Sequence, residues 1–385
     1  MITNKSAIIT KLPNVGTTIF TVMSSLANEY NAINLSQGFP NFPVSDELIS
    51  LVNQNMKKGY NQYAPMMGIK ELREVISEKT YNLYNVKYNP DSEITVTSGG
   101  TEAIFDAITA VVKTNDEVIV FEPAYDCYVP AIELNGGIPV YVSLKYPDYK
   151  IDWNEAKNKI TPKTKLIIVN TPHNPTGAVL DENDLKQLAN IVQNTNIFII
   201  SDEVYEHIIF DGLKHNSLIT VPELQQRSFI VSSFGKTFHA TGWKTGYCVA
   251  PKELTTEFRK MHQFITFSTF TPLQYALAEF LKNPANYNGL PKFYEKKRNI
   301  FLNSIKNSKF TFVPSKGSYF QNLCYSEISD EPDYDLAIRL TKEIGVASVP
   351  LSAFYHDKKD EKTLRFCFAK DDETLNRAGE RLAKL

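Results

Sequence analysis

The chain has 385 residues, of which 43% are hydrophobic and 22% charged, and its formal net charge is −2. The length suits two domains, or one large α/β domain with a smaller one attached. The near-neutral charge gives no basic field for nucleic acid, and no apolar run approaches the ~18 residues of a membrane helix. We therefore expect small-molecule chemistry, with no nucleic-acid partner and no membrane.

The cysteines and histidines show no metal-binding pattern. The four cysteines are far apart and form no C-x-x-C pair, and the six histidines form no H-E-x-x-H motif. Residues 1–13 contain no apolar signal segment. The sequence therefore predicts no metal site and a reduced, cytoplasmic setting.

The first part of the chain is rich in turns. In residues 35–43, prolines block regular structure and Gly38 can adopt a positive φ. Helical patterns follow at 47–58 and 69–84, and the segment 61–65 separates them.

After Pro90 short apolar runs alternate with helical stretches, such as 102–112 and 182–194. Several runs are nearly continuously apolar, as in strands buried on both faces of a sheet. The alternation predicts an α/β fold with a mostly parallel, seven-stranded sheet and right-handed crossovers. The predicted strands are 94–97, 118–121, 140–142, 166–169, 198–201, 229–231 and 247–250.

From about Pro284 the composition becomes helical and charged, and a smaller α+β domain is expected. We predict an N-terminal segment, 1–45, that joins this small domain, a large domain at 46–283, and the small domain at 284–385. The elements expected in the small domain are strands 310–313, 320–323 and 364–368 and a helix at 334–344.

Small and polar residues follow five of the predicted strands, at the ends where α/β sheets collect their ligands. These segments are 98–101, 123–125, 170–177, 202–205 and 232–236. Their chemistry suits pyridoxal 5'-phosphate. Gly100 and Thr101 open a helix whose N-terminus favours a phosphate, to which Ser233 and Lys244 add a hydroxyl and a positive charge.

The remaining groups suit the cofactor ring. Asp202 can pair with a pyridinium N–H, with a helix N-cap before Glu203 as the alternative. Asn174 and Tyr205 can donate to the ring oxygen and Tyr125 can stack on the ring, although each tyrosine taken singly fits a core aromatic better.

Lys236 is expected on a loop between two strands, and an exposed turn lysine is the alternative reading. With its pKa lowered by Lys244 and partial burial, the Lys236 amine could form a Schiff base with the cofactor and then move protons as an acid and base.

Six motifs in order resemble the class I aminotransferases of fold type I. Within that class the sequence is most similar to bacterial methionine aminotransferases and their kynurenine aminotransferase and glutamine transaminase K relatives, a branch that residues 17–20 and 61–66 also fit. The motifs are Gly38 with its proline-rich flank, Asn-Pro-Thr-Gly at 174–177, Asp-Glu-Val-Tyr at 202–205, Ser-Phe-Gly-Lys-Thr at 233–237, Thr-Gly-Trp-Lys-x-Gly at 241–246 and Arg-Phe-Cys-Phe-Ala-Lys at 365–370.

The resemblance implies a role for each cofactor residue. It implies the Schiff-base lysine at Lys236, the pyridine-nitrogen partner at Asp202, and contacts to the ring oxygen from Tyr205 and Asn174. It also implies a stacking ring at Tyr125 and a phosphate site formed by Gly100, Thr101, Ser233 and Lys244.

The resemblance further implies that Arg365 grips the substrate carboxylate as a bidentate fork, assisted by the N–H of Gly38 and by Asn174. Asn170 matches a residue close to cofactor and substrate, and Phe20 matches an aromatic of the side-chain pocket, which suits an apolar or thioether substrate. Tyr63 matches a tyrosine that reaches the phosphate of a neighbouring subunit. A homodimer with shared active sites follows from that match.

The expected function is ping-pong transfer of an amino group from an apolar or thioether L-amino acid to a 2-oxo acid. Methionine is the favoured substrate, and aromatic amino acids are the next candidates. Kynurenine-type enzymes commonly carry an aromatic residue where Thr101 stands, which argues against kynurenine. One alternative is a β-lyase acting on cystathionine or cysteine conjugates. A second is a cofactor-responsive transcription regulator, which would need a DNA-binding domain before the aminotransferase-like part, whereas this chain starts directly in its N-terminal segment and is not basic.

Overall fold

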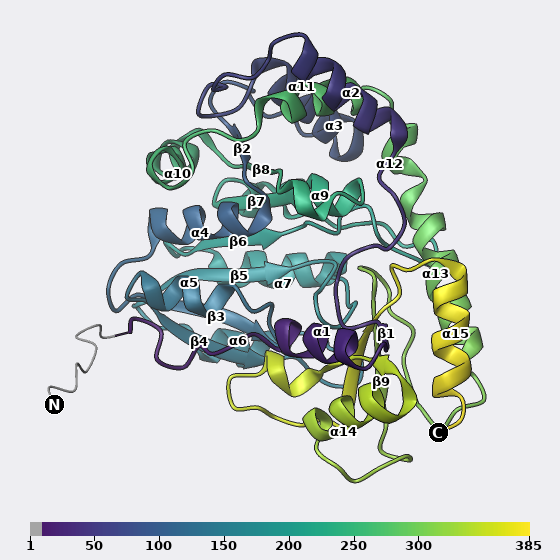
Figure 1. The fold of residues 1–385 in the computed structure, drawn as a ribbon. Coiled ribbons are helices and arrows are strands. Elements are labelled where there is room, and N and C mark those ends of the chain that lie inside the picture. The colour runs from purple at the N-terminus through teal and green to yellow at the C-terminus, as the bar shows by residue number, and fades with distance from the viewer. Residues whose placement is uncertain (1–9) are drawn as a thin grey trace, which may run out of the picture.

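The computed structural model describes residues 10–385, and its centre is a seven-stranded sheet (Figure 1). The strand order is β2-β8-β7-β6-β5-β3-β4, and every neighbouring pair is parallel except those of β8, which runs antiparallel to β2 and β7. All seven predicted strands are confirmed, as β2 (Ile94–Thr97), β3 (Glu117–Glu122), β4 (Ile138–Ser143), β5 (Thr164–Asn170), β6 (Phe198–Asp202), β7 (Ser228–Ser233) and β8 (Gly246–Val249).

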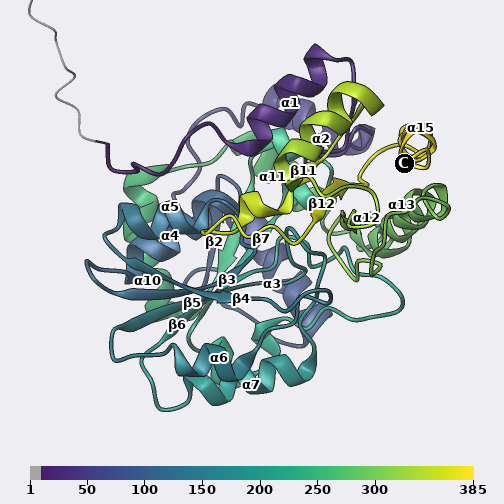
Figure 2. The same ribbon diagram turned by 90° about the horizontal axis from the view of Figure 1, so that it is seen from below.

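The strands are apolar throughout because both faces of the sheet are covered by helices. Side chains alternate along a strand, so Val118 and Val120 point to one face while Ile119 and Phe121 point to the other. Helices α4 (Gly100–Val111), α5 (Tyr128–Leu134) and α10 (Lys252–Ile265) lie on the first side. On the opposite face lie α6 (Trp153–Asn158) and α7 (Glu182–Val192) (Figure 2).

Three helices pack together beyond the β2 edge of the sheet: α2 (Asp46–Lys57), α3 (Lys70–Tyr84) and α11 (Thr271–Phe280). Shorter elements connect the main ones: η1 (Leu218–Thr220), α8 (Pro222–Gln225), α9 (Phe234–Thr237), η2 (Thr241–Trp243) and α12 (Ala285–Asn288).

The C-terminal elements surround a small antiparallel sheet in the order β11-β12-β9. Its strands are β9 (Phe320–Cys324), β11 (Val349–Pro350) and β12 (Thr363–Cys367). Helix α13 (Leu290–Ser304) packs against α15 (Asp372–Leu382). The remaining helices are α14 (Asp333–Arg339), the π-helical η3 (Leu340–Ile344) and η4 (Leu351–Phe354).

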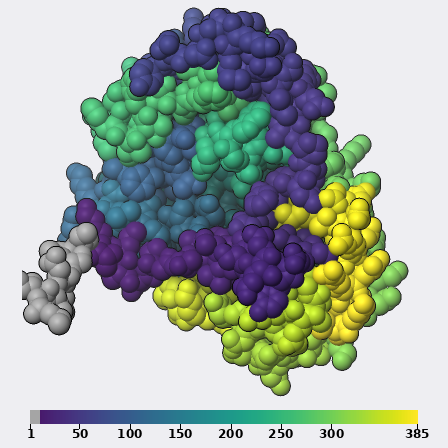
Figure 3. All heavy atoms as spheres, viewed as in Figure 1, coloured from purple at the N-terminus to yellow at the C-terminus, as the bar shows by residue number. Residues whose placement is uncertain are grey.

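The N-terminal residues lie against these C-terminal elements. Helix α1 (Ile19–Glu29) leads to β1 (Ile33–Asn34), which pairs with β10 (Val346–Ala347). The space-filling view shows this purple segment bordering a hollow at the centre of the molecule (Figure 3). The domain boundaries at residues 45 and 283 stay predictions.

The structure also corrects three sequence expectations. Helix α1, capped by Thr18, was not predicted. The strand predicted at 310–313 is wrong, because within it only Thr311 forms an isolated bridge, to Cys324. Lys236 lies in the short helix α9 and not in a loop. None of the described helices is long and apolar enough to cross a membrane.

Candidate active site

The carboxyl ends of β2, β3, β5, β6 and β7 open onto one cavity of about 200 Å³. Nearly all of the residues predicted to hold the cofactor line it, which confirms that the five strand ends converge. The predicted lining residues are Gly100, Thr101, Tyr125, Asn174, Asp202, Tyr205, Ser233, Lys236 and Lys244, and the structure adds Gly99, Ile104, Val204, Gly235 and Thr241.

One end of the cavity is the N-terminus of α4. Gly99 precedes the helix with φ +83°, and no side chain caps the first turn, so the N–H groups of this turn are available to a ligand. The Lys244 ammonium lies 3.6 Å from the point that a Cβ on Gly99 would occupy. A helix N-terminus beside a lysine and the Ser233 side chain is suited to an anion.

Asp202 lies at the end of β6 and is 3% exposed. Its carboxylate accepts a hydrogen bond from the Tyr128 hydroxyl over 2.6 Å and one from the Val204 N–H over 3.3 Å. Burial raises the pKa of Asp202 to about 6, although both hydrogen bonds favour the charged form. A turn follows, not a helix, so the N-cap alternative is wrong.

Lys236 reaches the cavity from α9 and meets the N-terminal segment. Its ammonium donates to the Tyr319 hydroxyl over 2.9 Å and to the Gly38 carbonyl over 3.4 Å. Burial lowers the pKa of Lys236 to about 8, and Lys244 makes a smaller contribution in the same direction. The sequence prediction had the direction right but gave Lys244 too much weight. The exposed-turn alternative is wrong, since Lys236 lines the cavity.

Gly38 is needed for close packing. The sequence had indicated that this glycine could adopt a positive φ, which it does not. Its φ is not positive, and a Cβ at this position would lie 2.8 Å from the Phe320 ring. Its carbonyl also accepts a hydrogen bond from the Tyr319 hydroxyl over 2.5 Å. Contact between the Gly38 N–H and a substrate stays a prediction.

Asn174 links the cavity to Arg365. The Arg365 guanidinium donates to the Asn174 side-chain oxygen and to the Ser36 carbonyl, over 2.9 Å in each case. Arg365 is 1% exposed, its Nε makes no hydrogen bond, and no carboxylate pairs with it among the described residues 10–385. Burial lowers its pKa to about 10. A buried cation with a free N–H is an evident site for a ligand carboxylate.

Aromatic rings surround this guanidinium. The Arg365 Cζ lies 4.0 Å from the Phe320 ring centroid, 5.0 Å from that of Phe354 and 5.1 Å from that of Phe20. The rings stabilise the cation and make its surroundings apolar. Phe20 therefore lies beside the arginine, as the predicted side-chain pocket requires, although it does not line the main cavity.

Two of the predicted cofactor residues lie away from the cavity lining. Asn170 supports it from behind: its side chain donates to the Asp202 carbonyl over 2.8 Å and accepts from the Asn174 N–H over 2.7 Å. Tyr63 is 83% exposed, and its ring packs edge-on against Phe267 at 5.3 Å. Its predicted contact with a neighbouring subunit stays a prediction.

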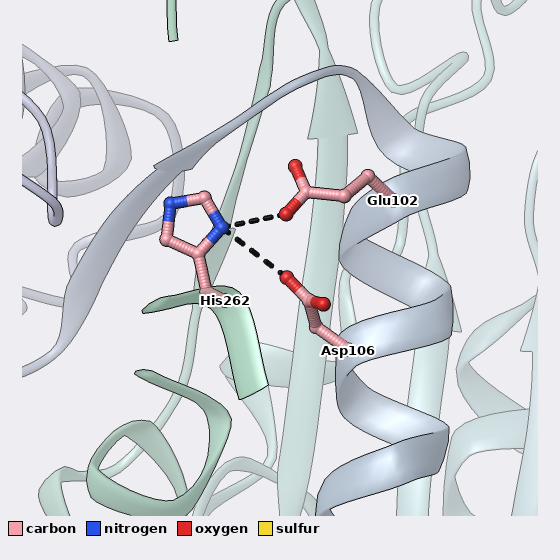
Figure 4. Close-up of side chains that lie close together, drawn as sticks. All are labelled: Glu102, Asp106 and His262. Atoms are coloured by element: carbon pink, nitrogen blue, oxygen red, sulfur yellow. Dashed lines mark hydrogen bonds and ion pairs between the residues drawn. The ribbon is translucent and has the colours of Figure 1, made fainter. Parts of the chain in front are cut away.

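Sequence reasoning missed several residues around the site. Tyr128 and Tyr319 contact Asp202 and Lys236, but no motif distinguishes these tyrosines from core aromatics. It also missed a buried group formed by Glu102 and Asp106 on α4 and His262 on α10 (Figure 4). The spacing of the two acids, one helical turn apart, was the only signal. The prediction of no metal site stays a prediction.

Comparison with known proteins agrees with this geometry. Residues 30–382 match the family model for aminotransferase class I and II. The chain is 48% identical over 376 residues to an Escherichia coli methionine aminotransferase, covering 97% of each chain, and 36% identical over 413 residues to a Dictyostelium discoideum kynurenine–oxoglutarate transaminase, covering 96% of this chain and 94% of the relative.

Solved structures show the same relationship. The structure of an E. coli methionine aminotransferase matches with a TM-score of 0.97 at 48% identity, over 98% of this chain and 99% of that one. The N-succinyldiaminopimelate aminotransferase of Mycobacterium tuberculosis matches with a TM-score of 0.95 at 33% identity, over 98% and 100%. This chain belongs to the aminotransferase class I and II family.

Proposed function

We propose that this aminotransferase uses pyridoxal 5'-phosphate to move the amino group of methionine, or of a similar apolar L-amino acid, to a 2-oxo acid. The observation that carries the proposal is the placement of two basic residues, the cavity-lining Lys236 and the buried Arg365, around a cavity that also holds the buried Asp202. The guanidinium, which has no carboxylate partner among the described residues 10–385, suits the carboxylate of an amino acid. The lysine, whose pKa is lowered, can release and take up a proton beside it.

The residues present fit the cofactor. The uncapped N-terminus of α4, with Lys244 and Ser233, would hold the phosphate. Asp202 is poorly stabilised as a carboxylate in its buried setting, and a pyridinium N–H would supply the missing positive partner. Asn174 and Tyr205 would contact the ring oxygen, and Tyr125 would stack on the ring.

When bound, the cofactor supplies an electron sink that stabilises negative charge at the substrate Cα. The protein's own residues do the rest. Arg365 would bind and orient the substrate carboxylate, with Asn174 fixing the guanidinium. Lys236, with a pKa of about 8, can give up and regain a proton near neutral pH and is placed to carry it. Asp202 would hold the ring nitrogen protonated.

The methionine preference rests on two supports. The E. coli relative at 48% identity carries that activity in its name. In this chain, Phe20 and Phe354, whose ring centroids are 5.9 Å apart, form an apolar wall beside Arg365, and a thioether packs well against such rings.

The proposal includes a homodimer with shared active sites. Three exposed phenylalanines lie close together in the sequence, and Tyr63 contacts one of them, Phe267. Tyr63 is 83% exposed and Phe264 is 88% exposed. The three phenylalanines are Phe264, Phe267 and Phe270. Exposed aromatics of this size favour burial in a protein interface. The cytoplasmic location expected from the sequence stays a prediction.

The deciding experiment is the visible absorption spectrum of the purified protein loaded with pyridoxal 5'-phosphate, before and after methionine is added without a 2-oxo acid. The cofactor band should disappear with methionine and return when a 2-oxo acid is supplied. A band that methionine leaves unchanged would overturn the substrate assignment. Release of pyruvate and ammonia from cysteine conjugates, without any acceptor, would favour the β-lyase instead.

A further inference from the structure

A buried ionic group lies directly behind the N-terminus of α4. The imidazole of His262, on α10, is fully buried, and its Nδ1 lies 2.6 Å from a Glu102 carboxylate oxygen and 3.3 Å from one of Asp106 (Figure 4). The other ring nitrogen, Nε2, lies 3.0 Å from the Met66 carbonyl. The partners that both ring nitrogens meet within the described part of the chain are therefore oxygen atoms.

These contacts indicate a positively charged imidazole. A carbonyl oxygen only accepts, so Nε2 must carry a hydrogen, and Nδ1 faces two carboxyl groups. Burial opposes the charge, but the hydrogen bonds to Asp106 and Glu102 and the charge of Glu102 outweigh it and raise the pKa of His262. Burial raises the pKa of Asp106, so one carboxyl group of the pair is neutral. The cluster then holds one imidazolium and one carboxylate, that of Glu102.

The same residue types can bind a divalent metal ion, but the spacing here is that of hydrogen bonds. Ligands at ~2.0–2.2 Å from one tetrahedral ion lie ~3.3 Å apart. The 2.6 Å between Nδ1 and Glu102 is shorter than that and fits a charge-assisted hydrogen bond.

Glu102 connects this cluster to the cavity. It lies in the first turn of α4, and its second carboxylate oxygen accepts a hydrogen bond from the Ser98 N–H, just before Gly99 and Gly100. This contact holds the chain where the helix begins. It also places a negative charge at the helix end proposed to bind a phosphate, and two anions at one helix N-terminus repel each other unless one is neutralised.

We propose that His262 is a positioning residue for anion binding: its imidazolium neutralises Glu102 and holds it against Ser98, so that the N-terminus of α4 accepts the phosphate of the cofactor. This inference rests on the proposed function, because it requires the phosphate to bind at this helix. His262 itself touches neither cofactor nor substrate. Its effect passes through Glu102 and the 98–101 segment.

The test compares two ligands that differ only in the phosphate. The full-length protein and its variants, freed of cofactor, are titrated with pyridoxal 5'-phosphate and with pyridoxal, following absorbance. His262→Asn, which keeps a polar group but no charge, is expected to weaken binding of the phosphorylated ligand about tenfold and to leave pyridoxal unchanged. In His262→Asn/Glu102→Gln, where no uncompensated charge remains, the affinity should return to nearly that of the wild type.

Equal losses for both ligands, or no recovery in the double variant, would show that His262 serves only the fold. If the wild-type protein binds neither ligand, the proposed function fails and this inference fails with it. If the wild type binds both ligands and His262→Asn binds pyridoxal 5'-phosphate with the same affinity, only the inference fails. If His262→Asn does not fold, His262→Gln and His262→Gln/Glu102→Gln are titrated in the same way, with the same loss and the same recovery expected for the phosphorylated ligand. A double variant that binds this ligand no better than His262→Gln would contradict the proposal.

Discussion

Arg365 and Asn174 are 191 residues apart in the chain, yet the guanidinium donates a 2.9 Å hydrogen bond to the Asn174 side-chain oxygen at the edge of the cavity. Asn174 also receives support from behind, because its N–H donates to Asn170. The arginine is thus held in place, while its Nε makes no hydrogen bond to any residue from 10 to 385. This arrangement leaves one edge of a planar fork for a substrate.

Replacing Arg365 should therefore harm carboxylate binding specifically. For Arg365→Lys, we expect kcat/KM for methionine to fall at least about a hundredfold, mostly through KM, because a point charge cannot reproduce the bidentate fork. Steady-state kinetics with methionine would measure this loss. The comparison amine is 3-(methylthio)propylamine, which lacks the carboxylate, and its reaction is followed through the absorption band of the bound cofactor. Arg377→Lys, on the exposed face of α15, is the matched control. A similar loss with the carboxylate-free amine would argue against the assignment.

Lys236→Ala should abolish turnover while the fold persists. Among the described residues 10–385, the Lys236 ammonium donates hydrogen bonds to Tyr319 and the Gly38 carbonyl, so its removal disturbs few contacts. Lys244, a second lysine that lines the cavity, lies at the N-terminus of α4, where the phosphate is proposed to bind. The rate should fall roughly 10³-fold or more. Circular dichroism and turnover assays check the two halves of this prediction, and Lys260→Ala on the exposed side of α10 is the control. Retained steady-state activity would remove Lys236 from the mechanism.

Asp202 should make the stability of the cofactor-free protein depend on pH. Its pKa is 3.8 in an ordinary setting and about 6 when folded, so the folded state binds a proton more tightly. The stabilisation that Asp202 provides through its raised pKa is fully present below about pH 4. It is lost as the pH rises through the folded-state pKa of about 6, and the total loss is roughly 3 kcal/mol, at about 1.4 kcal/mol per pH unit.

The free energy of unfolding by urea is measured from pH 4 to 7 for the wild type and for Asp202→Asn, and the two values are subtracted at each pH. The wild type should lose stability relative to the variant across this range, and Glu327→Gln, an exposed carboxyl group, should follow the wild type. A constant difference would mean that the Asp202 pKa is not raised. Adding pyridoxal 5'-phosphate should remove the decline, because its pyridinium would stabilise the charged carboxylate.

Tyr63 offers a direct test of shared active sites. If it completes the site of a neighbouring subunit, Tyr63→Ala and Lys236→Ala homodimers should both be poorly active. A mixed dimer has one site with an intact Lys236 and an intact Tyr63 from the partner, so each mixed dimer should have half of the wild-type activity. Because random pairing of equal amounts makes half of the dimers mixed, the mixture should approach about a quarter of the wild-type activity. The assay is turnover after unfolding and refolding the mixture, with sedimentation to report the oligomeric state. An active species that sediments as one chain would contradict the dimer.

The sheet and the chemistry at its edge could be predicted from the amino-acid pattern alone. Strands buried on both faces must be apolar throughout, so the runs from β2 to β8 were visible without any tertiary information. The polar segments that follow them must meet at one edge because the strands that carry them run in the same direction, and Asp202, Asn174 and Lys236 do meet there.

The contacts that shift the pKa values of these groups depend on the three-dimensional fold. Tyr128 and Tyr319 resemble any core aromatic in sequence, and their roles come from hydroxyls that reach Asp202 and Lys236 across the fold. His262 meets Glu102 across 160 residues, where no local pattern operates. The strand expected at 310–313 failed because one bridge, to Cys324, is all that its surroundings offer. The local periodicity of a sequence indicates which residues are buried. The pKa values and hydrogen bonds of those residues depend on which residues from distant parts of the chain are packed against them.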